Sequence, residues 1–159
     1  MERYQRIMIA NGLLVILVAM LAGFMLMFNL LGGIEIWPGH ILAIPTYGNE
    51  AGWVRAHSGG TMIGLMVVVM ALALPKLNLG ARALTWTAWG FVYIAWSFTI
   101  FYWVGNASSN RALTIGDSPL GQSDGLSVIG FLPGLPSVFL VVVLLWLAVR
   151  GVLRANAES

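Results

Sequence analysis

The chain has 159 residues, of which 59% are hydrophobic and 9% are charged, and its mean hydropathy is +0.88. This composition predicts an integral membrane protein of one compact unit rather than a soluble domain. The net charge of +2 argues against nucleic acid as a partner, and the absence of cysteine excludes disulfides, iron–sulfur clusters and a thiol nucleophile.

The first apolar run, residues 7–31, predicts a membrane-spanning helix. It would be about 37 Å long, which is enough to span with tilt and too long for a cleavable signal peptide. Residues 34–51 contain Pro38, Pro45 and several glycines, so we expect a loop that lies in the membrane interface. We interpret His40 in this loop as an interfacial hydrogen-bonding residue, with metal ligation as the alternative.

Residues 51–74 predict the second helix, and His57 is the one histidine inside a predicted span. Residues 58–74 would rise about 26 Å, which nearly fills a hydrocarbon core of about 30 Å. We therefore expect His57 near one edge of that layer. An ionisable side chain there is costly unless it is paired or bound, so a ligand or a partner is the leading hypothesis.

Small residues recur along one face of the same helix, at Ala56, Gly60 and Gly64. This spacing is typical of close helix packing. It also suits a flat cofactor seated against backbone, because a porphyrin held by His57 needs small residues one turn along the helix, such as Gly60 and Thr61. The sequence alone does not decide between helix packing and cofactor binding.

Residues 81–104 predict the third helix, which follows a turn centred near Asn78. One face carries an aromatic stripe that we expect to pack between helices or subunits: Trp86, Trp89, Tyr93 and Trp96. A second face carries Phe98 and Tyr102. Because helices two and three run antiparallel, His57 and Tyr102 should lie within about 4–5 Å of the same depth. The Tyr102 hydroxyl would meet a group bound at His57, or serve as an interfacial anchor.

A polar loop, residues 105–124, is expected to cap the same side, and residues 125–150 predict the fourth helix with Asp124 as its N-cap. Pro133 and Pro136 either kink this helix or mark the true start of its span. Six of the eight basic residues lie at the two termini and the 75–82 turn, and only Arg55 and Arg111 lie on the other side. This bias predicts that both termini are cytoplasmic.

The available side chains limit the chemistry. A Ser-His-Asp triad lacks a carboxylate in any predicted span, and zinc would require more ligands than two histidines supply. A haem requires only one axial histidine and an apolar slot. A single ligand would leave the sixth iron position open for catalysis, whereas His40 as a second ligand would point to electron transfer or sensing. A cofactor-free structural subunit is the third reading.

Several segments resemble the styrene oxide isomerase family over nearly the whole chain. The most specific are Arg-Ala-His-Ser-Gly at 55–59 and Asn-Arg-Ala-Leu-Thr at 110–114, supported by residues 29–36 and by Trp-Ser at 96–97 and Phe-Tyr at 101–102. The resemblance implies a small four-helix protein of the bacterial inner membrane, surrounded by lipid and assembled as a homotrimer, with haem b at the subunit interfaces.

The same resemblance implies which residues form the site. The axial histidine falls on His57 and the residue that orients the epoxide falls on Tyr102, while Arg55 and Arg111 are candidates to pair with the haem propionates. The implied reaction is the rearrangement of an aryl epoxide, such as styrene oxide, to an aldehyde, with ferric iron as the Lewis acid. Water must be excluded because it would capture the cation as a diol.

Two positions depart from the family pattern. Ile63 and Phe98 stand where asparagines are expected on the substrate side near Tyr102, and His40 stands where a tyrosine is expected. Two amides that could position an epoxide are therefore replaced by apolar side chains. We expect Ile63 and Phe98 to contact a larger or more apolar epoxide.

Overall fold

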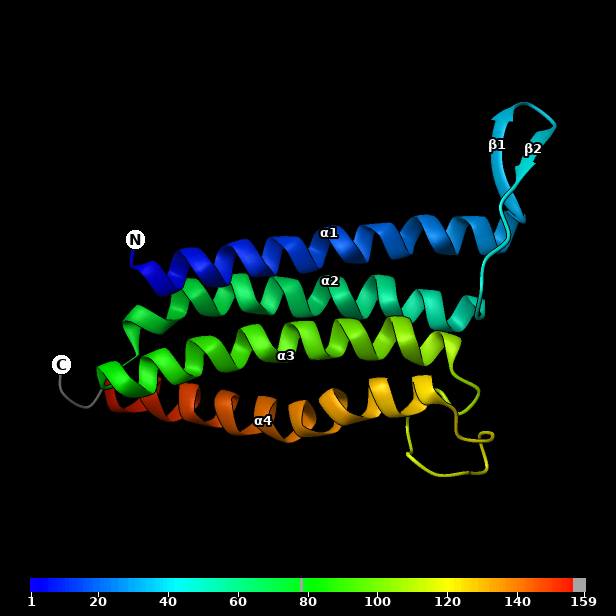
Figure 1. The fold of residues 1–159 in the computed structure, drawn as a ribbon. Coiled ribbons are helices and arrows are strands. Elements are labelled where there is room, and N and C mark those ends of the chain that lie inside the picture. The colour runs from blue at the N-terminus through cyan, green and yellow to red at the C-terminus, as the bar shows by residue number, and fades with distance from the viewer. Residues whose placement is uncertain (78, 156–159) are drawn as a thin grey trace.

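The structure is a computed structural model that describes residues 1–77 and 79–155. Within these residues four helices are long and apolar enough to cross a membrane: α1 (Arg3–Leu31), α2 (Glu50–Ala73), α3 (Ala81–Ala107) and α4 (Gly125–Ala155). They run alternately up and down, so both ends of the chain lie at the same end of the bundle (Figure 1). The all-helical membrane fold agrees with the prediction. Asn78, the expected centre of the second turn, lies outside the described residues.

The helices form one curved array in chain order, in which α2 packs on α1 and α3, and α4 packs on α3 (Figure 1). The main core lies towards the end that carries the termini and includes Met8, Val67, Phe91 and Ile94. Here α1 also meets α3, where Trp96 Nε1 donates a hydrogen bond of 2.8 Å to Asn11 Oδ1. Buried apolar packing thus fixes this end of the bundle, while the opposite end carries the longer connections.

The small-residue stripe of α2 lies against α1. A Cβ atom at Gly60 would be 2.9 Å from the Cβ of Ala19, and one at Gly64 would be 2.7 Å from the carbonyl oxygen of Gly12. Glycine therefore allows the two backbones to approach closely. The helix-packing interpretation is confirmed, and the expected contact of Gly60 with a cofactor is corrected, because α1 fills the space beside it.

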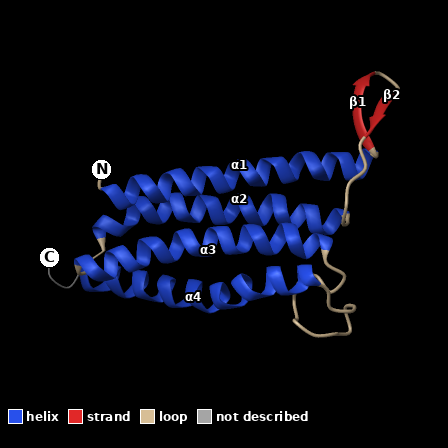
Figure 2. Cartoon of the chain, viewed as in Figure 1, coloured by secondary structure: helices blue, strands red, loops and turns tan. Residues whose placement is uncertain are grey.

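A β-hairpin interrupts the segment predicted as a loop. Strands β1 (Gly33–Trp37) and β2 (His40–Ala43) pair antiparallel through a turn at Pro38 and Gly39. Gly39 has φ +81°, as the third position of a type II turn requires, and its amide donates to Glu35 Oε1 at 2.7 Å. The proline and glycine predicted a break in regular structure, whereas they form a turn that joins two short strands. The hairpin projects beyond the end of α1 (Figure 2).

Capping side chains fix the residues at which α2 and α4 begin. Asn49 Oδ1 accepts from the amide of Gly52 at 2.9 Å, and α2 ends in a short 3₁₀ helix, η1 (Leu74–Lys76). Asp124 Oδ1 accepts from the amide of Ser127 at 2.6 Å, while Ser127 Oγ accepts from the amide of Asp124 at 3.1 Å. This reciprocal cap confirms Asp124 as the N-cap. Helix α4 then continues through both of its prolines.

Candidate functional site

The imidazole of His57 lies against α1. Its Nδ1 atom is 2.9 Å from the carbonyl oxygen of Ala19, and a Cβ atom at Gly23 would be 2.9 Å from the same nitrogen. Since a carbonyl oxygen can only accept, Nδ1 carries the proton and Nε2 of the neutral ring carries the lone pair. Nε2 has no hydrogen-bond partner within residues 1–77 and 79–155, and it is not sealed inside the protein.

This arrangement is the one that metal-ligating histidines adopt. A ligating imidazole donates its other ring N–H to a carboxylate or a backbone carbonyl, which fixes the tautomer and the ring plane. Ala19 supplies that acceptor, and Gly23 supplies the space that the ring occupies. The residues present therefore suit a metal bound at Nε2 of His57.

His57 lies beside the second half of α1. It contacts Ala19 and Gly23, which precede the end of α1 at Leu31 by about 12–18 Å of helix. Helix α2 begins at Glu50, close to the predicted residue 51, and continues for about 10 Å beyond His57, so the position of His57 relative to the hydrocarbon layer stays a prediction.

Tyr102 packs on the other flank of α2. A Cβ atom at Gly59 would be 2.8 Å from Tyr102 Cε2 and 3.0 Å from its hydroxyl oxygen. Residues 57 and 59 differ by about 3 Å along the helix axis, so the predicted similarity in depth holds. They also differ by about 200° around the axis, so His57 faces α1 while Gly59 faces Tyr102 of α3. One chain does not bring the two side chains together.

A cavity of about 250 Å³ with a partly polar lining lies beside Tyr102 at the end of the bundle opposite the termini. It is lined by Arg55 from α2, Arg111 from the connecting loop, and Phe101, Gly105, Asn106 and Leu113. The predicted residues Arg55, Arg111 and Tyr102 are thus gathered at one place. Their donors would suit a ligand that carries oxygen atoms or negative charge.

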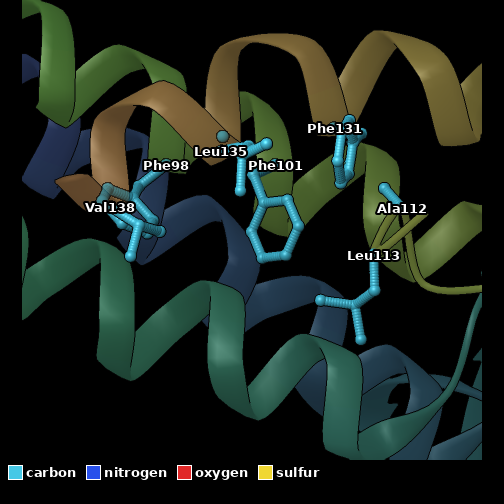
Figure 3. Close-up of a pocket in the computed structure, with 8 residues that line it drawn as sticks. Phe98, Phe101, Ala112, Leu113, Phe131, Leu135 and Val138 are labelled. Carbon is cyan, nitrogen blue, oxygen red and sulfur yellow. The ribbon is translucent and has the colours of Figure 1, made fainter. Parts of the chain in front are cut away.

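An apolar cavity of about 110 Å³ adjoins the first one and shares Phe101 and Leu113 with it. Figure 3 shows this apolar cavity, with side chains from α3, α4 and the connecting loop around it: Phe98, Phe101, Ala112, Leu113, Phe131, Gly134, Leu135 and Val138. The two cavities together form one groove over α3, polar at its outer end and apolar further in. We refer to it as the α3 groove.

The two departures from the family pattern have different positions. Phe98 lines the apolar cavity, and its ring centroid is 5.9 Å from that of Tyr102. Ile63 instead packs against the main core and is not among the side chains that line either cavity. The predicted contact of Ile63 with the substrate stays a prediction.

The loop after α3 is held by a buried asparagine. Asn110 is fully buried, its Oδ1 accepts from Ser108 Oγ and the amide of Ala112, and its Nδ2 donates to both oxygens of Thr114. These bonds hold Arg111 and Ala112 at φ +61° and +54°, in the left-handed region that side chains rarely adopt. Asparagine and threonine of the 110–114 motif thus set the conformation that brings Arg111 to the α3 groove.

Sequence reasoning missed Asn106. Its Oδ1 accepts from the amide of Asn49 at 3.0 Å, and its side chain fits a slot that glycines 48 and 52 leave open. Its Nδ2 is buried without a hydrogen-bond partner in the described part of the chain. An asparagine near the end of an apolar helix was the only available signal, and it reads equally well as an ordinary loop residue.

The position of the hairpin excludes the alternative in which His40 and His57 of one chain both bind the same haem. His40 is exposed on β2, which projects past the end of α1, whereas His57 lies about 12–18 Å back along that helix (Figure 1). Ligation of one haem by both histidines of the same chain is therefore not possible in this structure.

Comparison with known proteins agrees with these features. The sequence model of the styrene oxide isomerase family matches residues 4–153. A curated protein named styrene-oxide isomerase, from Pseudomonas fluorescens, is 35% identical over 133 residues, which cover 84% of this chain and 79% of that protein. The family match includes the His57 flank, the α3 groove and the 110–114 loop, and the chain belongs to the styrene oxide isomerase family of enzymes.

Proposed function

We propose that the chain is an epoxide isomerase of the bacterial inner membrane, which converts an apolar aryl epoxide to the aldehyde with haem b bound at His57. The observation that supports the cofactor is the hydrogen bond from Nδ1 to Ala19, because it leaves Nε2 with a free lone pair at a partly exposed flank of the bundle. When bound there, ferric haem would supply a Lewis acid for the epoxide oxygen.

We further propose that the complete site is formed between copies of the chain in a homotrimer. His57 and Tyr102 occupy opposite flanks of α2, so a head-to-tail ring would place the His57 flank of one copy against the Tyr102 flank of the next. A ring of this kind repeats the same contact at each interface and closes on itself.

The side chains of the α3 groove would then have separate roles. Tyr102 would donate its phenolic hydrogen to the epoxide oxygen, and the two arginines, Arg55 and Arg111, would pair with the carboxylates of the cofactor. Phe98 and Phe101 would keep water away from the carbon that loses its bond to oxygen. That C–O bond breaks, a hydride moves from the neighbouring carbon, and the carbonyl forms, so substrate and product have the same atoms and oxidation level.

The membrane setting suits such a substrate. Four spanning helices place the α3 groove within reach of the lipid phase, where an apolar epoxide concentrates. Both cavities are open at the surface of the bundle. Lipid is therefore the expected surrounding of the protein and the route by which substrate arrives.

The first experiment compares the purified protein with His57→Ala. The wild type is expected to show a haem Soret band and to convert styrene oxide to phenylacetaldehyde, with deuterium at the terminal carbon retained in the product. His57→Ala is expected to lose the band and the activity. A colourless wild type, or one whose turnover survives loss of the imidazole, would refute haem ligation at His57.

A second experiment tests whether two copies form each site. Tyr102→Phe and His57→Ala chains are each expected to be nearly inactive, but their co-expression should regenerate intact sites at about a quarter of the interfaces of randomly mixed trimers. Recovery of activity requires that the two residues come from different chains. A site contained in one chain would give no recovery.

A further inference from the structure

The apolar part of the α3 groove exists because α4 has a gap in its side chains at Gly134. This glycine is flanked by Pro133 and lies directly opposite Phe101, so that a Cβ atom at residue 134 would be 3.0 Å from Phe101 Cδ2. Phe131 and Leu135 border the gap on α4. The cavity is thus lined by seven apolar side chains and by one position, Gly134, that has no side chain.

The cavity has the chemistry of a site for a hydrocarbon group. All of its lining side chains are apolar, and its volume is about 110 Å³. An apolar cavity of roughly 150 Å³ stays dry and binds benzene, so a space of this size suits one aromatic ring. A second fused ring would meet Phe131 or Leu135.

The apolar cavity also lies directly beside Tyr102, at the polar end of the groove. Phe98 and Phe101 are in contact with Tyr102, with ring centroids 5.9 and 5.7 Å from that of the tyrosine. A molecule with its oxygen at the Tyr102 hydroxyl would therefore extend its carbon skeleton over these two rings. Aromatic faces attract positive charge, which develops on the ring-bearing carbon as the C–O bond breaks.

We propose that this cavity binds the aryl group of the epoxide, and that Phe131, Gly134 and Leu135 of α4 limit that group to a single ring. The proposal rests on the function proposed above and specifies its substrate class as epoxides that carry one aryl ring or an apolar group of similar size. It assigns α4 a role in specificity, although α4 contributes no polar side chain to the groove.

The test compares two epoxides, styrene oxide and 2-naphthyloxirane, on the same preparation of each holoenzyme variant. The ratio of their kcat/KM values cancels the amount of folded, haem-loaded protein, so a partly unfolded variant remains informative. Phe131→Ala and Leu135→Ala are expected to raise the naphthyl-to-phenyl ratio by about 10-fold or more, because each removes a bulky side chain from the wall. Gly134→Ala is expected to lower it, because the added methyl group displaces Phe101. The matched control is Phe139→Ala, which removes an aromatic side chain of α4 that is 65% exposed on the surface.

The outcomes separate the two proposals. The subsite is supported if the naphthyl-to-phenyl ratio rises in Phe131→Ala and Leu135→Ala, falls in Gly134→Ala and does not change in Phe139→Ala. A wild type that isomerises epoxides while all three variants keep its ratio would overturn the subsite and leave the function intact. A wild type that isomerises neither epoxide would overturn the function and the subsite together.

Discussion

The hydroxyl oxygen of Tyr102 lies 3.0 Å from the position that a Cβ atom would occupy on Gly59. The two residues come from α3 and α2, and the missing side chain at position 59 allows the hydroxyl end of the phenol ring to approach the α2 backbone. The neighbouring glycine, Gly60, instead faces Ala19 of α1. Two adjacent glycines thus serve different contacts, one at the candidate site and one in the α1–α2 packing.

Gly59→Ala is expected to displace the Tyr102 ring and lower kcat/KM by about 10- to 100-fold, since a shift of about 1 Å in a positioning group can cost that much. Thermal unfolding should change little, because the phenol end can move towards the groove. Gly60→Ala is the matched control: it should lower the unfolding temperature by wedging α1 from α2, with a cost of about 1–3 kcal/mol. Equal effects of both substitutions on activity per folded protein would contradict the assignment of Tyr102 to the site.

Gly23→Ala is expected to weaken haem binding by about 10- to 100-fold, as loss of a partner that orients a metal ligand does. The new Cβ atom would be 2.9 Å from His57 Nδ1 and 3.0 Å from Cε1, so the ring must leave the Ala19 carbonyl. The haem-to-protein ratio and the Soret position measure the effect. Gly12→Ala also crowds α2 but does not touch His57, and it should keep the haem content of the folded fraction. Normal haem loading in Gly23→Ala would show that the Ala19 contact is dispensable.

Asn110→Ala is expected to destabilise the protein by about 2–3 kcal/mol, because it removes the buried bonds that hold the loop and leaves the amide of Ala112 without its acceptor. Arg111 should then lose its fixed position at the groove. Thermal or denaturant unfolding measures the first effect, and KM measures the second. Gln122→Ala, in an exposed position of the same loop, is the control. An unfolding temperature equal to that of the control would argue against the structural role of Asn110.

Acid is expected to loosen the start of α4 through Asp124. Its pKa is lowered from 3.8 to about 2, first by the side-chain hydrogen bond from Ser127 and then by the amide of the same residue. A carboxyl group with a lowered pKa stabilises the folded state above its ordinary pKa and loses that contribution as the pH falls towards 2. Unfolding temperatures should therefore fall between about pH 4 and pH 2. Asp124→Asn should flatten this dependence, while Asp117→Asn should keep it; an unchanged profile in Asp124→Asn would assign the acid effect to another group.

Helical segments and several site residues followed from the sequence because local patterns determine them. Long apolar runs have no alternative to a helix in lipid, where every backbone polar group must be paired internally. The cap at Asp124 depends only on residues within one turn, and the similar depth of His57 and Tyr102 depends only on the rise per residue and the antiparallel order. The hairpin at Gly33–Ala43 was missed because its turn residues also occur in irregular loops.

The sequence by itself therefore determined that this is a four-helix membrane protein, that His57 is its one intramembrane histidine, and that its motifs are those of an isomerase family. Only the tertiary structure decided which side of α2 each neighbour occupies. Gly60 faces α1, Gly59 faces Tyr102, and Nδ1 of His57 donates its hydrogen to the carbonyl oxygen of Ala19. Phe98 lines the α3 groove, whereas Ile63 does not. The physical reason is that an apolar sequence in a membrane is apolar on every face, so its pattern does not reveal the direction from which the next helix packs.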